Sequence, residues 1–147
     1  MPRPLTKPER EQFLAETHVG VFTMPDGERG PLICPVWYTY SVGGVVAFCT
    51  KKDARKAKLL KVGARVSFLV QLEGDIGRGA LPRYVAVEGP VVKCETANMD
   101  RDLRPIMHRY LGVEIGDGYL KATRGDSAEG ELVVQIRPER WRSRDFA

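Results

Sequence analysis

Hydrophobic and polar residues alternate along several segments of this chain, with the two-residue period of strands that bury one face. The segments are rich in Val, Phe, Tyr and Thr and are separated by the turn-forming residues Gly, Pro and Asp. They predict about six strands, at residues 18–24, 31–40, 45–49, 65–72, 83–95 and 131–141, the last followed by an arginine-rich tail. Short turns join the first three into a predicted three-strand meander. Gly89 and Pro90 predict a bulge or sharp bend that lets one strand serve two faces of a barrel.

Other segments carry helical signals. A capping-box pattern at residues 6–9 begins a short helix that ends near residue 16. Further helical segments are predicted at 53–62, at 97–112 with a break or kink at Pro105, and, as a turn or two, at 117–125. Because the strands follow one another instead of alternating with helices, a doubly wound parallel sheet is disfavoured. The pattern predicts a mainly β (α+β) fold, a small β-barrel with peripheral helices, in a single domain over residues 1–147.

Composition narrows the class of protein. With 43% hydrophobic and 29% charged residues, a chain of 147 residues is typical of one globular domain. Its apolar runs are shorter than the ~18–20 residues of a membrane helix, and its first residues are too polar for a signal peptide, which favours a cytoplasmic protein without a membrane partner. Three cysteines without CxxC spacing and two distant histidines predict free thiols and no metal site. The net charge of +4 fits an anionic ligand but is low for a dedicated nucleic-acid binder.

The densest positive charge lies at residues 50–58, TKKDARKAK, where Asp53 is the only acid among five cations. Thr50 stands where a strand gives way to a helix, so its hydroxyl and the nearby backbone N–H groups can meet an anion, aided by the helix dipole. Arginine offers a fork for phosphate oxygens and lysine a compact charge. A solvated helix face is the alternative interpretation.

The aromatic stretch VWYTY, residues 36–40, places Trp37 on one side of a strand and Tyr38 and Tyr40 on the other. One side must fill the barrel, and the other is free to pack against a second subunit or to line the pocket of a flat ligand. The sequence contains no GxGxxG leading into a helix, no GxSxG, no HExxH and no P-loop. Because no nucleophile or acid–base dyad emerges either, an enzyme with this sequence would need a cofactor to carry the chemistry.

The order of the segments PVWYTY…GGVVAFCT, KKDARKAKLL, RVSFLV and RYVAVEGPV resembles the split β-barrel flavin-binding superfamily that contains pyridoxamine-phosphate oxidase. It is more closely similar to the flavin/deazaflavin oxidoreductases of actinobacteria that use coenzyme F-420. The resemblance covers roughly residues 10–95 and returns at WRSRDF near the end of the chain. It departs from the family at Ala54, where relatives often carry Ser, and at 59–60, where many have Asn-Leu. It implies a split β-barrel and a homodimer whose subunits share the cofactor cleft.

The resemblance also assigns residues. A phosphate of the cofactor would be held by Thr50, Lys51, Arg55 and Lys56, with Lys58 nearby. The ring system would lie along Pro35, Val36 and Trp37. Residues of the second chain, Arg83, Tyr84 or Trp141, would close the site. The phosphodiester and polyglutamate tail of F-420 would give the additional cations Lys51, Lys52 and Lys58 partners that FMN lacks.

These assignments imply an oxidoreductase that moves a hydride from reduced F-420 to a small, electron-poor substrate, with solvent or the Tyr38 hydroxyl as the proton source. An FMN-dependent enzyme of the same fold is the second hypothesis. The third is a non-catalytic module that binds a flavin-like molecule, haem or nucleic acid. Nucleic acid is disfavoured because the basic helix has no interleaved aromatic residues on which bases would stack.

Overall fold

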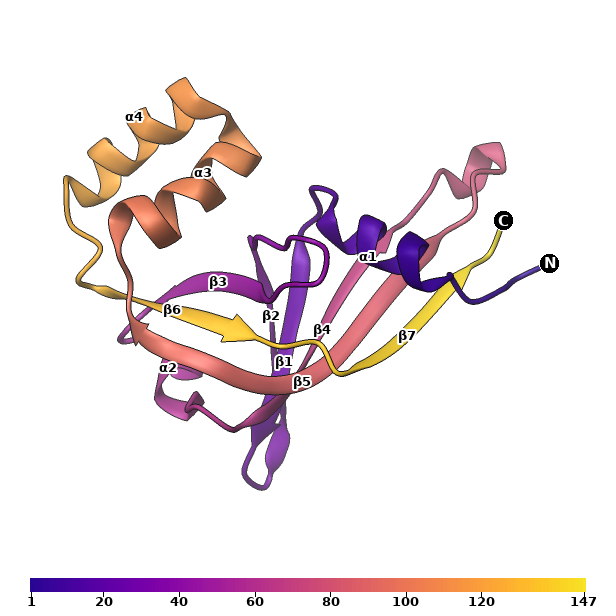
Figure 1. Ribbon diagram of the computed structural model, residues 1–147, viewed down its shortest axis with the longest axis horizontal. Coiled ribbons are helices and arrows are strands. Elements are labelled where there is room, and N and C mark those ends of the chain that lie inside the picture. Colours follow the sequence, from indigo (N-terminus) through magenta and orange to yellow (C-terminus); the bar gives the residue numbers. More distant parts are fainter.

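The computed structural model describes residues 1–147 apart from the side chain of Ile76. Its strands are β1 (Gly20–Asp26), β2 (Arg29–Val36), β3 (Val46–Lys51), β4 (Arg65–Leu72), β5 (Arg83–Thr96), β6 (Glu131–Ile136) and β7 (Arg140–Asp145). Its α-helices are α1 (Lys7–Ala15), α2 (Arg55–Leu59), α3 (Arg104–Leu111) and α4 (Val113–Arg124). The strands form one antiparallel sheet in the order β2-β1-β4-β5-β6-β3, with β7 added beside β5, and the sheet curls into an open barrel (Figure 1). The α3–α4 pair stands to one side of this barrel, while α1 lies near the two chain ends (Figure 1).

The long strand β5 turns the corner of the barrel. Residues 83–88 pair with both β4 and β7, whereas residues 91–96 pair with β6. The register shifts between Val91 and Lys93, just beyond the predicted bend. At Gly89 a Cβ atom would lie 1.8 Å from the carbonyl oxygen of Arg137, so only glycine lets the connection after β6 pass this closely. The prediction that one strand serves two faces of the barrel is therefore confirmed.

Two predictions about strands are wrong. Strand β3 pairs with β6 and not with β2, so the first three strands do not form a meander. The reason is that the chain leaves the sheet after Val36 and turns inward to bury Tyr38 and Tyr40, which leaves only an isolated bridge from Thr39 to Ala47. The second wrong prediction is the arginine-rich tail. Residues 140–145 form strand β7, which follows β6 after a break at Pro138.

Each predicted helical segment contains or overlaps a helix, but the bounds differ. In α1 the Thr6 hydroxyl accepts from the Glu9 N–H, and the Glu9 carboxylate accepts from the Thr6 N–H at 2.8 Å, which confirms the capping box. Helix α2 ends at Leu59, short of the predicted 62. The predicted helix at 97–112 consists of a π-helical turn at Met99–Leu103 followed by α3, and Pro105 lies in the first turn of α3. Helix α4 is longer than the predicted turn or two.

Two hydrophobic clusters hold these elements together. The larger fills the barrel and is centred on the rings of Phe22, Phe48, Phe68 and Tyr38. The smaller joins the α3–α4 pair to the sheet and contains Leu103, Met107, Leu120 and Val133. Because the second cluster rests on β6, α3 is held beside the end of β3, where the candidate site lies. Among the described helices, none is long and apolar enough to cross a membrane.

Candidate functional site

A polar hollow of about 230 Å³ lies between the end of β2, the end of β3 and helix α3. We call it the Thr50 pocket. Five residues predicted from the sequence to bind a cofactor line it together: Pro35, Val36, Trp37, Thr50 and Lys56. The rest of its lining is Cys49, Leu103, Ile106, Met107, Arg124 and Glu131. The strand end and the basic helix that follows it therefore meet the aromatic stretch at one place.

Thr50 carries an unused hydrogen-bonding group into this pocket. Its residue is only 4% exposed, and its Oγ1 atom is buried without a hydrogen-bond partner in the described part of the chain. A buried hydroxyl without a partner costs about 1–3 kcal/mol, so such a group marks a place where a polar ligand is expected. Lys56, half-buried on α2, supplies a positive charge to the same pocket. The pair fits an anionic oxygen ligand such as a phosphate.

A buried ion pair forms another wall of the Thr50 pocket. The Nε of Arg124 donates to Oε2 of Glu131 at 2.8 Å, and its Nη2 donates to Oε1 at 3.2 Å. The side chains are 19% and 8% exposed, and the hydrogen bonds that Arg124 donates to Glu131 raise the pKa of Arg124. Arg124 ends α4 and Glu131 begins β6, so the pair also fastens the helices to the sheet. Neither residue was predicted from the sequence. The one local indication was Glu131 itself, an acid at the first position of an apolar strand.

Trp37 is held in place by a residue that the sequence did not single out. Its ring stacks on Tyr110 of α3 with the centroids 4.7 Å apart and the planes 4° from parallel. The Tyr110 hydroxyl donates to the His18 carbonyl and accepts from the Tyr38 N–H. Because β2 has ended at Val36, this hydroxyl replaces a strand partner for Tyr38. Trp37 remains 37% exposed at the rim of the pocket.

An apolar hollow of about 340 Å³ adjoins the Thr50 pocket. It is lined by Val19, Pro35, Val36, Trp37, Met107 and Tyr119. Pro35, Val36, Trp37 and Met107 line both spaces, which shows that they are neighbours. No side chain in the apolar lining carries a formal charge. The two hollows together suit a molecule with an anionic end and an uncharged body.

Several residues predicted to bind the cofactor lie elsewhere. Arg55 turns away from the pocket and donates to Asp26 at 2.6 and 3.0 Å. Lys51, Lys52 and Lys58 are exposed and do not line the Thr50 pocket. Within this chain, then, Lys56 lines the pocket and Arg55 forms a structural ion pair, while the other cations of the basic cluster are exposed.

The residues expected from a second chain are also distant from the Thr50 pocket. Arg83 pairs with Asp145 at 2.8 Å, and Tyr84 and Trp141 line a separate hollow beside β7. Strand β5 carries Arg83 and Tyr84 at the end opposite to the end that pairs with β6. They can close the Thr50 pocket only from another copy of the chain.

Tyr38 does not face the Thr50 pocket, which argues against a role as proton donor. Its side chain is fully buried in the barrel, and its hydroxyl donates to the Leu14 carbonyl at 2.6 Å. Burial raises its pKa further above the ordinary value for tyrosine. Cys49 does lie in the pocket, but burial raises its pKa to about 12, so the thiol is protonated at neutral pH. The described residues contain no group of three or more His, Cys, Asp or Glu side chains that suits a metal ion.

Comparison with known proteins identifies the architecture. No protein-family model and no curated protein matches the sequence. A conserved hypothetical protein from Mycobacterium tuberculosis superposes with a TM-score of 0.71 and 21% identity, over 96% of this chain and 85% of its own. An FAD-binding protein from Mesorhizobium loti superposes with a TM-score of 0.68 and 17% identity, over 100% of this chain and 99% of its own. A protein described as an F-420 reductase has a TM-score of 0.60 and 19% identity, over 89% of this chain and 94% of its own.

The fold is a split β-barrel. The fold class predicted from the sequence is thus confirmed, with seven strands in place of about six because the arginine-rich tail pairs with β5. In this split barrel the Thr50 pocket and the apolar hollow lie where the chain departs from β2 and where β3 ends, on the side covered by α3.

Proposed function

We propose that this split barrel binds a flavin-type cofactor, in the first place the deazaflavin F-420, across the Thr50 pocket and the apolar hollow, and acts as an oxidoreductase on a small, electron-poor substrate. The observation that carries the proposal is the unpartnered, buried hydroxyl of Thr50 beside Lys56, next to an apolar space. This arrangement suits a ligand with a phosphate at one end and a flat, uncharged ring system at the other. The fold shared with an FAD-binding protein and with an F-420 reductase supports the same reading.

The proposal gives each part of the site a task. Thr50 and Lys56 bind phosphate oxygens, and the Arg124–Glu131 pair keeps the wall behind them rigid. Pro35, Val36 and Trp37 position the ring system. When bound in its reduced form, the deazaflavin supplies a hydride. The protein supplies proximity and orientation, and the proton comes from solvent because Tyr38 is buried and hydrogen-bonded.

F-420 is preferred to FMN because exposed cations surround the basic helix. Lys51, Lys52 and Lys58 form no ion pair with the described carboxylates, so they remain free for a longer anionic chain. A non-catalytic flavin- or haem-binding protein is the second candidate. It is favoured by one observation: apart from Lys56, the ionised side chains that line the pocket are Arg124 and Glu131, and these are already bonded to each other.

We further propose that the protein works as a homodimer. Arg83, Tyr84 and Trp141, which the family resemblance assigns to the cofactor site, do not line the Thr50 pocket of their own chain, so in this proposal a second copy brings them to it. In this arrangement each subunit contributes the phosphate end of one site and the closing residues of the other.

Paired titrations with F-420 and FMN test the proposal. Quenching of tryptophan fluorescence reports binding, because Trp37 lines the pocket. We expect saturable F-420 binding and weaker FMN binding. Lys56→Ala should lower the affinity at least tenfold, whereas Lys61→Ala, which removes an exposed lysine outside the pocket lining, should not.

The possible outcomes separate the candidates. Binding of FMN alone would assign the FMN-dependent alternative, and binding of neither cofactor would remove the proposed function. Oxidation of reduced F-420 by an added electron-poor acceptor would distinguish an enzyme from a binding protein.

A further inference from the structure

A second polar hollow, of about 260 Å³, lies beside β7 and the segment that precedes α1. We call it the β7 hollow. Its lining is Pro4, Leu5, Arg10, Tyr84, Trp141, Arg142, Ser143 and Arg144. None of these residues lines the Thr50 pocket of the same chain, so the two hollows are separate within one subunit.

The arginines around the β7 hollow differ from most others in this chain. Nearly every arginine elsewhere, from Arg3 to Arg137, forms an ion pair with a carboxylate. Arg10, Arg142 and Arg144 form no ion pair within the described residues, and neither does Arg140 at the start of β7. Positive charge that is uncompensated within the fold is therefore concentrated along one strand and the helix beside it.

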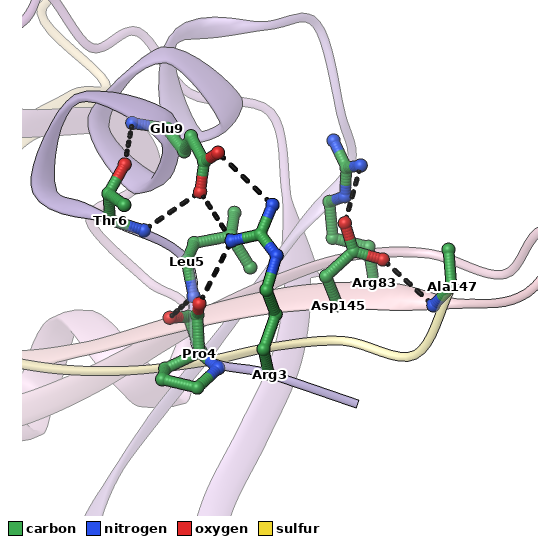
Figure 2. A network of polar contacts seen from close by, with 9 residues as sticks. Arg3, Pro4, Leu5, Thr6, Glu9, Arg83, Asp145 and Ala147 are labelled. Atoms are coloured by element: carbon green, nitrogen blue, oxygen red, sulfur yellow. Dashed lines mark hydrogen bonds and ion pairs between the residues drawn. The ribbon is translucent and has the colours of Figure 1, made fainter. Parts of the chain in front are cut away.

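Two of the acids near these arginines in sequence, Glu9 and Asp145, are already engaged, as Figure 2 shows. Glu9 accepts from the Arg3 guanidinium at 2.8 and 3.1 Å, and Asp145 accepts from Arg83 at 2.8 Å and from the Ala147 N–H at 3.0 Å. Glu11, the other neighbouring acid, forms no ion pair with these arginines. None of these three carboxylates therefore forms an ion pair with Arg10 or Arg144.

Arg10 is held in position and still lacks an acceptor. Its guanidinium carbon lies 4.8 Å from the centroid of the Trp141 ring, a cation–π contact. Its Nε is buried and has no hydrogen-bond partner among the described residues. Ser143 accepts from the Leu5 N–H at 3.0 Å, which leaves its own hydroxyl hydrogen free to donate. Donors from two elements therefore converge on one space without an anion to receive them.

The strand sets the spacing of the remaining charges. Arg140, Arg142 and Arg144 alternate with Trp141 and Ser143, so they project to one side of β7 about 6.5 to 7 Å apart. Strand β7 pairs only with β5, which leaves its other edge open apart from a bridge at Arg3. A row of this spacing matches a small molecule with several anionic groups better than a single monovalent ion.

We propose that the β7 hollow is a binding site for a small multivalent anion, whose phosphate or carboxylate oxygens are held by Arg142 and Arg144 from one side of β7 and by Arg10 from the other, across the open edge of the strand. Guanidinium forks bind both kinds of group in bidentate fashion. In the proposed homodimer Tyr84 and Trp141 also border the partner's Thr50 pocket, so the test of this inference uses Arg142 and Arg144, to which the proposed function gives no role.

Calorimetric titration at low ionic strength with tripolyphosphate and, separately, with citrate tests the site and distinguishes the two chemistries. Fluorescence of Trp141 in a Trp37→Phe background reports binding at the hollow itself. We expect one of the two anions to bind saturably and to lose at least tenfold in affinity in the double variant Arg142→Ala, Arg144→Ala. The double variant Arg142→Lys, Arg144→Lys should recover part of this loss.

Arg29→Ala is the matched control, because Arg29 is exposed, unpaired in the described chain and lies on the β1–β2 hairpin away from the hollow. Arg29→Ala removes one positive charge, as each substitution in β7 does, but it should leave anion binding unchanged. The proposal is overturned if neither anion binds, or if Arg29→Ala weakens binding as much per charge as the β7 variants do. In that case the arginines serve only to keep the open strand edge soluble.

Discussion

Trp37 and Tyr110 stack face to face, with ring centroids 4.7 Å apart and planes 4° from parallel, although they lie far apart in the sequence. This contact joins helix α3 to the place where the chain leaves the sheet. Because Trp37 lines both the Thr50 pocket and the apolar hollow, the position of α3 decides the shape of both spaces.

Changes at Tyr110 should separate the stack from the hydrogen bonds. Tyr110→Phe keeps the ring but leaves the Tyr38 N–H and the His18 carbonyl without their partner, which should cost about 1–3 kcal/mol in the free energy of unfolding. Tyr110→Leu should also release Trp37, change its near-ultraviolet circular dichroism and weaken cofactor binding. Tyr84→Phe, which removes a hydroxyl without a hydrogen-bond partner in the described chain, is the control and should leave stability unchanged. Equal ligand affinity in Tyr110→Leu and the parent would show that the stack does not shape the site.

Thr50→Val should affect the ligand more than the fold. The buried hydroxyl has no partner in the described chain, so its replacement by a methyl group should leave the free energy of unfolding unchanged or raise it by about 1 kcal/mol. Affinity for a phosphate-bearing cofactor should fall about tenfold, the value of one charge-assisted hydrogen bond. Urea unfolding and fluorescence titration measure the two effects, and Thr50→Ser should retain binding. A clear loss of stability in Thr50→Val would indicate that the hydroxyl has a structural partner instead.

Breaking the Arg124–Glu131 pair should destabilise the protein. Arg124→Met leaves the Glu131 carboxylate buried without its partner, which typically costs about 3–5 kcal/mol. The double variant Arg124→Met, Glu131→Leu should recover most of that loss in urea unfolding, because neither charge remains. A loss below about 1 kcal/mol in Arg124→Met would mean that solvent replaces the pair without penalty.

Glu9 should make stability depend on pH in acid. The hydrogen bond from Arg3, followed by that from the Thr6 backbone, lowers the pKa of Glu9 from 4.5 to about 2. A depressed pKa stabilises the folded state above the unfolded value, so this contribution is complete above pH 4.5 and is lost as the pH falls toward 2. Glu9→Gln should flatten the pH dependence of the urea midpoint in this window. Glu28→Gln, an exposed control without an ion pair in the described chain, should not, and high salt should reduce the effect of Glu9.

Cys49 should react slowly with alkylating reagents. Burial is the main cause that raises its pKa to about 12, so very little thiolate exists at pH 8. Mass spectrometry after treatment with iodoacetamide should find Cys49 modified far more slowly in the folded protein than in urea. Labelling at the same rate in both states would contradict the closed environment that the structure gives this residue.

Features that depend on neighbours in the sequence were predictable. The capping box of α1 joins residues three apart, and the predicted strand at 65–72 coincides with β4 because its period reflects one buried face. The convergence of Pro35, Val36, Trp37, Thr50 and Lys56 was expected only through a family resemblance, and the structure does bring these residues together.

The tertiary structure decided which distant groups meet. The basic cluster looked uniform in sequence, yet Arg55 is bound by Asp26 while Lys56 faces the pocket. Strand β3 could not be assigned to β6, nor Arg124 to Glu131 or Tyr110 to Trp37, because such pairings depend on how the whole sheet curls. The sequence by itself determined the local elements and their buried faces, since hydrogen bonds and side-chain period act over a few residues. The tertiary structure decided the strand partners, the ion pairs and the walls of the Thr50 pocket and the apolar hollow, because groups far apart in the chain compete there for the same contacts.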